Sequence, residues 1–184
     1  NPLVMEKVKV DSEVRKLQTL KSHYVQNLYT MQNDIALLPQ RIDAAQKRLE
    51  GLEKDLKTRN IPEKFSMTIN GKVFTERKDA GKAILDIATR LSGTDSIEKI
   101  GEYAGLDLYV RTYHYGFMKP SIIAKGVVEH SGNIGESDIG VIHSIDHALK
   151  SIDLRIGSDR QSLETMEKSL KDLKNEVQKP FQHE

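Results

Sequence analysis

The stretch VDSEVRKLQTLKSHYVQNLYTMQNDIALLPQRIDAAQKRLEGLEKDL, residues 10–56, decides the fold. Its apolar residues recur at alternating spacings of three and four, which is typical of a helix that presents a narrow stripe to another helix. Only Lys21 interrupts this N-terminal seam with a polar side chain. The seam consists of Val10, Val14, Leu17, Lys21, Tyr24, Leu28, Met31, Ile35, Leu38, Ile42, Ala45, Leu49, Leu52 and Leu56.

A second seam with the same spacing lies near the other end of the chain, where Asp159 is the single polar interruption. It consists of Ile142, Ile145, Leu149, Ile152, Ile156, Asp159, Leu163, Met166, Leu170, Leu173 and Val177. Two long seams separated by a compact segment pair most simply as an antiparallel helical hairpin. The sequence therefore predicts an α+β fold with a long two-helix coiled-coil stalk, formed by residues 1–60 and 139–184, and an inserted head at residues 61–138.

Pro39 lies inside the N-terminal seam without disturbing its register. A proline removes one backbone donor and clashes with the preceding turn, so the pattern indicates a kinked but continuous helix. The antiparallel alignment places Gly157, Ser158 and Asp159 opposite Leu38 and Pro39. We therefore expect both helices to bend at that level and to leave a local gap.

The head is expected to contain five strands and one helix in the order β-β-α-β-β-β. Asn70-Gly71 separates two short alternating segments, 65–69 and 72–75, and is the strongest short signal for a β-hairpin. A helix is predicted over 76–91, and further strands over 96–103, 106–113 and 121–129. These elements suit an antiparallel sheet covered on one face by the helix.

Composition excludes several classes of protein. The 184 residues carry a net charge of only +1, so bulk charge does not indicate a nucleic-acid partner. The absence of cysteine excludes disulfides and thiolate metal sites and is compatible with a cytoplasmic location. No apolar run approaches the roughly 20 residues needed to span a bilayer, so no membrane partner is expected. The chain opens on Asn1-Pro2 instead of Met, which favours a piece of a larger or processed protein.

Several short motifs carry a resemblance to a known family. They are Asn1-Pro2-Leu3, Glu6-Lys7-Val8, Asp11, Glu13-Val14 and Leu17, then Phe65–Lys72, Arg77–Gly81, Ile100–Gly105, Gly132–Gly135 and Lys179-Pro180-Phe181. With these the chain resembles the segment after the helicase core in very large mobile-element proteins that fuse an adenine DNA methylase to a Swi/Snf-type helicase. The chain departs from that pattern at 144–147, where an Arg and an Asn would be expected. The resemblance implies an accessory region of such a parent protein.

Enzyme motifs are not evident in the sequence. Gly71-Lys72 and Gly81-Lys82 lack the surroundings of a phosphate-binding loop. His143 and His147 have the spacing of two metal ligands on one helix face, but no third ligand follows. Ser144, Asp146 and His147 are neighbours on one helix and cannot converge as a hydrolase triad. We therefore expect no independent enzymatic activity, no cofactor and no metal.

The best functional candidate in the sequence is the run from Tyr109 to Tyr115. Strand periodicity places Tyr109, Arg111, Tyr113 and Tyr115 on one face, opposite Leu106, Leu108 and Val110. Aromatic side chains with an interleaved arginine form a platform on which unstacked bases can stack. Lys119 and Lys125 on adjoining segments would hold phosphates. The alternative is that this face packs against the covering helix or the stalk, and the ten Lys/Arg against eleven Asp/Glu in 61–138 also weigh against DNA.

Two functional hypotheses follow. The first is a non-catalytic accessory module of a DNA methylase–helicase, which supports contacts with DNA or with other domains of the parent protein. The alternative is a protein–protein interaction or oligomerisation module without nucleic-acid binding, in which the stalk can form a homodimer.

Overall fold

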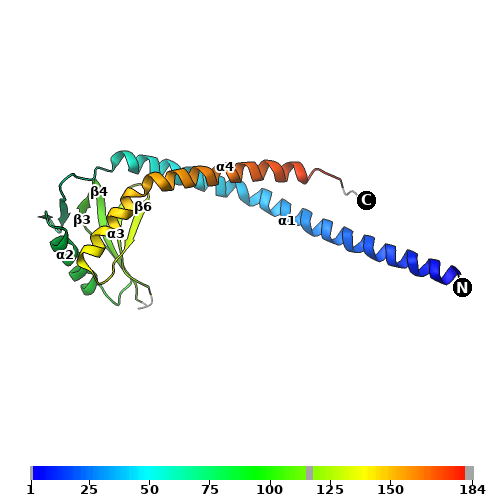
Figure 1. Cartoon of the computed structure of the whole chain (residues 1–184), viewed down its shortest axis with the longest axis horizontal. Coiled ribbons are helices and arrows are strands. Elements are labelled where there is room, and N and C mark those ends of the chain that lie inside the picture. Colours follow the sequence, from blue (N-terminus) through cyan, green and yellow to red (C-terminus); the bar gives the residue numbers. More distant parts are fainter. Residues whose placement is uncertain (1, 115–117, 181–184) are drawn as a thin grey trace. The chain divides into compact units, whose positions relative to one another are not determined.

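The structure is a computed structural model that describes residues 2–114 and 118–180. In these residues it is a mixed α+β fold with four helices and a six-stranded antiparallel sheet (Figure 1). The elements are α1 (Pro2–Thr58), β1 (Met67–Ile69), β2 (Lys72–Phe74), α2 (Arg77–Arg90), β3 (Ser96–Tyr103), β4 (Leu106–Thr112), β5 (Ser121–Lys125), β6 (Glu129–Asn133), α3 (Asp138–Lys150) and α4 (Ile152–Glu176).

The chain divides into two compact units. The helical unit comprises Asn1–Gln46 and Gln161–Glu184, and the sheet unit comprises Lys47–Arg160. The division falls inside α1 and α4, so each of these helices contributes to both units. The predicted domain boundaries at residues 60 and 139 lie at the ends of expected helices and strands, whereas this division follows the compactness of each unit. The predicted boundaries therefore stay predictions.

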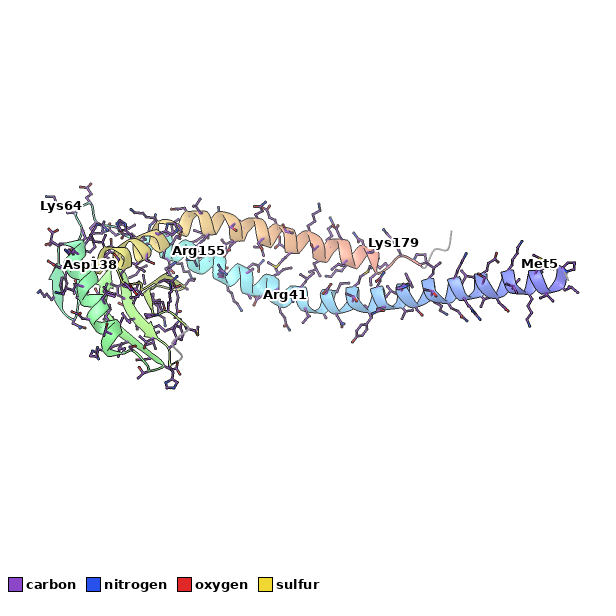
Figure 2. All side chains as sticks on the ribbon, turned by 60° about the horizontal axis from the view of Figure 1, so that its bottom comes forward. Met5, Arg41, Lys64, Asp138, Arg155 and Lys179 are labelled. Atoms are coloured by element: carbon purple, nitrogen blue, oxygen red, sulfur yellow. The ribbon has the colours of Figure 1, made fainter. Side chains whose placement is uncertain are left out.

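Within the helical unit, the predicted seams are the half-buried faces of the two helices. From Tyr24 to Ala45 each seam position of α1 is partly shielded from solvent, whereas the positions between them are exposed. The Tyr24 hydroxyl donates to the Lys179 carbonyl at 3.0 Å, and the Gln46 amide donates to Glu167 at 3.5 Å. The two segments therefore run in opposite directions. Residues 2–23 of α1 are exposed throughout, as around Met5 in Figure 2.

The expected alignment at Pro39 is wrong. α1 continues through Pro39, as the sequence indicates, but Leu38 lines a groove with Ser169 and Leu173. Asp159, expected opposite Leu38, instead forms an ion pair with Arg48 at 3.0 Å. The residues that open the C-terminal seam instead belong to the core of the sheet unit, which also contains Leu52 of α1.

Those residues form a separate helix. The single final helix expected from the sequence is two helices, α3 and α4, which are separated at Ser151. Ile142, Ile145 and Leu149 of α3 are completely buried in the core of the sheet unit. Ser137 caps α3, since its hydroxyl accepts a hydrogen bond from the Gly140 amide at 3.1 Å. The core packing continues into α4 through Ile152 and Ile156, so the shared spacing gave no sign of the division at Ser151.

The sheet has the strand order β2-β1-β3-β4-β5-β6, and every neighbouring pair is antiparallel. Asn70 and Gly71 form the predicted hairpin turn, both with positive φ. The expectation of five strands is incomplete, because residues 129–133, predicted as the end of a strand and a loop, form a sixth strand that pairs with β5. Its sequence, Glu-His-Ser-Gly-Asn, lacks the β-branched and aromatic residues that mark strands.

Helices α2 and α3 pack together on one face of the sheet (Figure 1). The core contains Ile84 of α2, Val141 of α3, and the β4 residues Leu108 and Val110. The two helices approach closely at Gly81, where an added Cβ would lie 1.9 Å from the Asp138 carbonyl oxygen. A hydrogen atom at this position is therefore a condition for the observed packing of α2 on α3.

A polar cluster ties the same layers together at the buried carboxylate of Asp146. It accepts a hydrogen bond from the Tyr103 hydroxyl at 2.6 Å and forms an ion pair with Arg77. The Arg77 guanidinium also stacks over the Phe65 ring, 4.8 Å from its centroid. Burial raises the pKa of Tyr103, so its hydroxyl stays a donor at physiological pH. Asp146 thus has a structural role in joining α3 to β3 and α2.

We predict that Gly81→Ala lowers the free energy of unfolding of the sheet unit by about 1–3 kcal/mol, because the added methyl overlaps a backbone carbonyl. Gly157→Ala is the matched control, since Gly157 is also helical and nothing lies within 4 Å of its added Cβ. This control should be stabilised by roughly 0.5–1 kcal/mol. Urea unfolding of both variants tests the contact, and equal stability of the two would contradict it.

Candidate interaction surfaces on the sheet

The face of the sheet opposite α2 and α3, which we call the open face, carries the predicted platform, although Ile123 on this face is completely buried. In β4, Leu106, Leu108 and Val110 are buried, whereas Tyr109 and Arg111 alternate with them and are half-buried. Leu108 and Val110 belong to the core beneath α2 and α3, so Tyr109 and Arg111 lie on the opposite face. The sheet register places Ile123 directly beside Tyr109. The alternation that the sequence predicted is present in β4.

The cations on this face already have partners in the chain. Arg111 forms an ion pair with Glu129 of β6 at 3.0 Å, and Lys99 of β3 forms one with Asp107 at 2.9 Å. The Lys125 ammonium lies 5.6 Å from the centre of the Tyr109 ring, on which it stacks, and 3.9 Å from Glu129. The open face therefore pairs each of these positive charges with a carboxylate.

The other candidate residues are less closely grouped. Tyr113 follows the last residue of β4 and is half-buried, and Lys119 is exposed before β5 begins. Tyr115 lies outside the described residues. The structure brings Tyr109, Arg111 and Lys125 together on neighbouring strands β4 and β5, and no ion pair or hydrogen bond described in the chain joins Tyr113 or Lys119 to them.

A groove between β6 and α3 is the second candidate surface, and sequence reasoning missed it because β6 itself was missed. We call it the edge groove. It has a volume of about 650 Å³ and is lined by Glu129, Ser131, Gly132 and Asn133 on β6, by Ser144, His147 and Ala148 on α3, and by Arg155 on α4. His143, one of the two histidines noted in the sequence, also lines it. The groove follows the free edge of the sheet, since β6 is its last strand.

The hydrogen bonds between β6 and β5 show which backbone groups of β6 point away from the sheet. The Val128 carbonyl accepts from Gly126 at 3.2 Å, and the Ile134 amide donates to Pro120 at 2.8 Å. In an antiparallel ladder the backbone groups of alternate residues point to the same side. The groups of residues 130 and 132 therefore face β5, and those of residues 129, 131 and 133 face the free edge. Among the described residues, no backbone or side-chain hydrogen bond to these outward groups is present.

A buried polar network lies beside the edge groove and centres on Asp55 of α1. The Asp55 carboxylate accepts hydrogen bonds from the Val127 and Val128 amides at 2.7 and 2.8 Å, and from Nε2 of His130 at 2.9 Å. Asp55 is 2% exposed and His130 is completely buried. Three donors satisfy this carboxylate, which is the condition for burying a charge at acceptable cost.

The charge state of His130 follows from its second partner. Nδ1 lies 3.0 Å from Nη1 of Arg155, and a guanidinium can only donate. Nδ1 must therefore accept, Nε2 carries the proton that goes to Asp55, and the imidazole is neutral. Burial lowers the pKa of His130, in agreement with this assignment. The only sequence signal for this network is weak: Asp55 is one of several charged residues in a helix, and His130 lies in an unpromising segment.

His143 and His147 are exposed on α3. In the described residues no group of three or more His, Asp or Glu side chains is arranged to hold a metal ion. None of the described helices combines the length and apolar character needed to cross a membrane. Comparisons of the chain with protein-family models, with curated proteins and with solved structures find no match.

We predict that the sheet unit loses stability as the pH falls below about 6.5, the ordinary pKa of histidine. The unfolded chain then binds a proton at His130 that the folded chain, with its lowered pKa, does not bind. This loss ends once the pH is below the folded pKa. Urea unfolding across this range should show a smaller slope with pH for His130→Gln than for the unsubstituted chain.

His143→Gln is the matched control, because it removes an exposed imidazole from the same unit. It should keep the slope of the unsubstituted chain. If His130→Gln and His143→Gln change the slope equally, then the neutral buried imidazole is not the cause.

Proposed function

We propose that the chain is a non-catalytic accessory module that works by binding protein, either a neighbouring domain of its parent protein or a separate partner. The resemblance to mobile-element DNA methylase–helicase proteins supports a parent of that class. The sheet unit supplies the interaction surfaces in this proposal, and its buried polar residues serve the fold. Asp55, His130 and Asp146 are each engaged by partners inside the sheet unit.

The observation that carries the proposal is the pairing of the cations on the open face. Nucleic-acid binding gains most of its affinity when free Lys and Arg side chains replace counterions at phosphates. Arg111 and Lys99 would have to break ion pairs with Glu129 and Asp107 before they contacted a phosphate. Glu129 and Asp107 would also repel the phosphate backbone. A half-buried, electrically balanced face with Tyr109 at its centre suits a protein surface better than a nucleic acid.

The helical unit fits the role of a spacer. Its half-buried seams, Tyr24–Ala45 on α1 and Leu163–Val177 on and just after α4, have the spacing of a two-helix coiled coil. We take an antiparallel coiled-coil stalk as part of the proposed function. In this role it would act as a spacer between the sheet unit and the rest of the parent protein.

The exposed start of α1 favours a second candidate function, oligomerisation. The seam continues through Val10, Val14 and Leu17 without a described partner, and these side chains are 38–52% exposed. Because this stripe continues the pairing surface of the helical unit, a second copy of the chain is the occupant that it fits. Sedimentation velocity of the full chain tests this, since a dimer supports it and a monomer at high concentration removes it.

We predict that the chain binds neither single- nor double-stranded oligonucleotides with a salt-dependent affinity. Fluorescence anisotropy over a range of salt concentrations measures this, and a steep decrease of affinity with salt would contradict the proposal. Glu129→Gln gives the test a positive arm, because it frees Arg111 and Lys125. This variant should gain weak binding with a salt slope of about one to two.

Glu63→Gln is the matched control for this variant. It makes the same change in net charge at an exposed residue that forms no ion pair in the described structure. It should leave oligonucleotide binding unchanged. Equal gains for Glu63→Gln and Glu129→Gln would show that net charge, and not the release of Arg111, controls binding.

A further inference from the structure

We propose that the edge groove binds an extended, acidic peptide segment of a partner protein, which pairs with β6 as a seventh strand of the sheet. This inference rests on the proposed function in one respect, that the chain works by binding protein. It adds the site, the backbone conformation of the ligand and the charge that the ligand carries.

The free edge of β6 supplies the backbone pairing. The outward amides and carbonyls of Glu129, Ser131 and Asn133 lie in one row, which spans about 13 Å at roughly 3.3 Å per residue. Strand addition satisfies such a row with the backbone of an extended peptide, and about five residues of peptide match this length. Ser131 and Asn133 are exposed to solvent in the free chain, so the ligand gains affinity only where it also fills the groove.

The two edges of the sheet differ in how they are protected. β2, at the other edge, has three residues and carries Lys72, whose ammonium lies over the Phe74 ring at 5.0 Å. Short length and a lysine are features that prevent edge pairing in natural sheets. β6 has five residues, neither lysine nor proline, and one charged residue, Glu129, whose charge is engaged by Arg111. The sheet is therefore protected at β2 and open at β6.

The wall of the groove is formed by small side chains. Gly132 lies so close to α3 that an added Cβ would be 2.5 Å from the Ser144 hydroxyl. Ser144, Ala148 and Ser151 follow one another along the side of α3 and α4 that lines the groove. A strand beside β6 lies about 4.8 Å away from it, and these short side chains leave room for the alternate side chains of that strand. The site thus has both a pairing edge and a space beside it.

Among the described residues, the groove is lined by one cation, Arg155, and by one carboxylate, Glu129, whose charge is engaged by Arg111, so Arg155 favours an acidic ligand. Arg155 lines the groove and uses one guanidinium N–H to hold the neutral His130. No carboxylate in the described part of the chain forms an ion pair with Arg155. Figure 2 shows Arg155 near the start of α4, close to the end of α3. Asp55 and Asp159 lie close enough to interact electrostatically with Arg155, but neither forms an ion pair with it. A half-buried arginine in this position can bind a carboxylate in bidentate geometry.

The experiment begins with selection of random seven-residue peptides against the full chain. The expected outcome is enrichment of peptides that combine β-branched residues with at least one Asp or Glu. A selected peptide is then titrated against the chain and two variants. Ser131→Pro removes an outward N–H without touching the ladder to β5, and proline is tolerated at such an edge position. It should weaken binding at least about tenfold, whereas Ser131→Ala should stay within about twofold.

Charge selection is tested with the same peptide after its acidic residue is replaced by the amide. The replacement should weaken binding by about tenfold to the unsubstituted chain and have no effect on binding to Arg155→Gln. Equal losses with both proteins would overturn the role of Arg155. Circular dichroism of each variant excludes unfolding as the cause of lost binding.

Amide hydrogen exchange gives a readout that needs no variant. In the free chain the amides of residues 130 and 132 should exchange slowly, and those of residues 131 and 133 should exchange fast. A bound peptide should slow the hydrogen exchange of the amides of residues 131 and 133.

If these amides are unaffected by a bound peptide, or if no peptide is enriched, the strand-pairing proposal is wrong. Peptides that bind but ignore Ser131→Pro would overturn the site and leave protein binding intact. Salt-dependent oligonucleotide binding without peptide binding would overturn both.

Discussion

The buried carboxylate of Asp55 is the interaction on which the sheet unit depends. It lies near the end of a helix, yet its hydrogen bonds go to the turn that joins β5 to β6 and to a histidine on β6. An added Cβ on Gly126 would be 2.2 Å from the Asp55 carboxylate, so this turn accepts the contact only because it has glycine there. One side chain thus fixes the position of a hairpin that has little apolar content of its own.

The consequences extend to both candidate surfaces. β6 contributes two buried residues to the unit, His130 and Gly132, and neither offers much apolar area. Hydrogen bonding to Asp55 and Arg155 replaces hydrophobic packing as the reason why this strand is ordered. Once β6 is in place, Glu129 pairs with Arg111 on the open face, and the outward amides of β6 border the edge groove. The neutralised face and the open edge therefore have one origin.

Local patterns in the sequence predicted the elements that depend on local physics. The seam from Tyr24 to Ala45, the Asn70-Gly71 turn and the alternation in β4 were all correct, because side-chain periodicity and positive φ are written into neighbouring residues. The spacing of the C-terminal seam was correct as well, but it does not distinguish a helix packed on a sheet from one paired with another helix. The division into α3 and α4 at Ser151, and the displaced pairing at Pro39, were missed for that reason.

The candidate residues show the same limit. Period 2 placed Tyr109 and Arg111 together, but the carboxylate that pairs with Arg111 comes from a strand without a strand-like sequence. Asp55 and His130 are 75 positions apart, and nothing local marks them as partners.

The most direct test of the central role of Asp55 is the free energy of unfolding of Asp55→Asn. The amide replaces an acceptor by a donor, so at least one of the three hydrogen bonds must be lost. We expect a decrease of at least about 2 kcal/mol and faster exchange of the Val127 and Val128 amides. Unchanged stability and exchange would contradict the account.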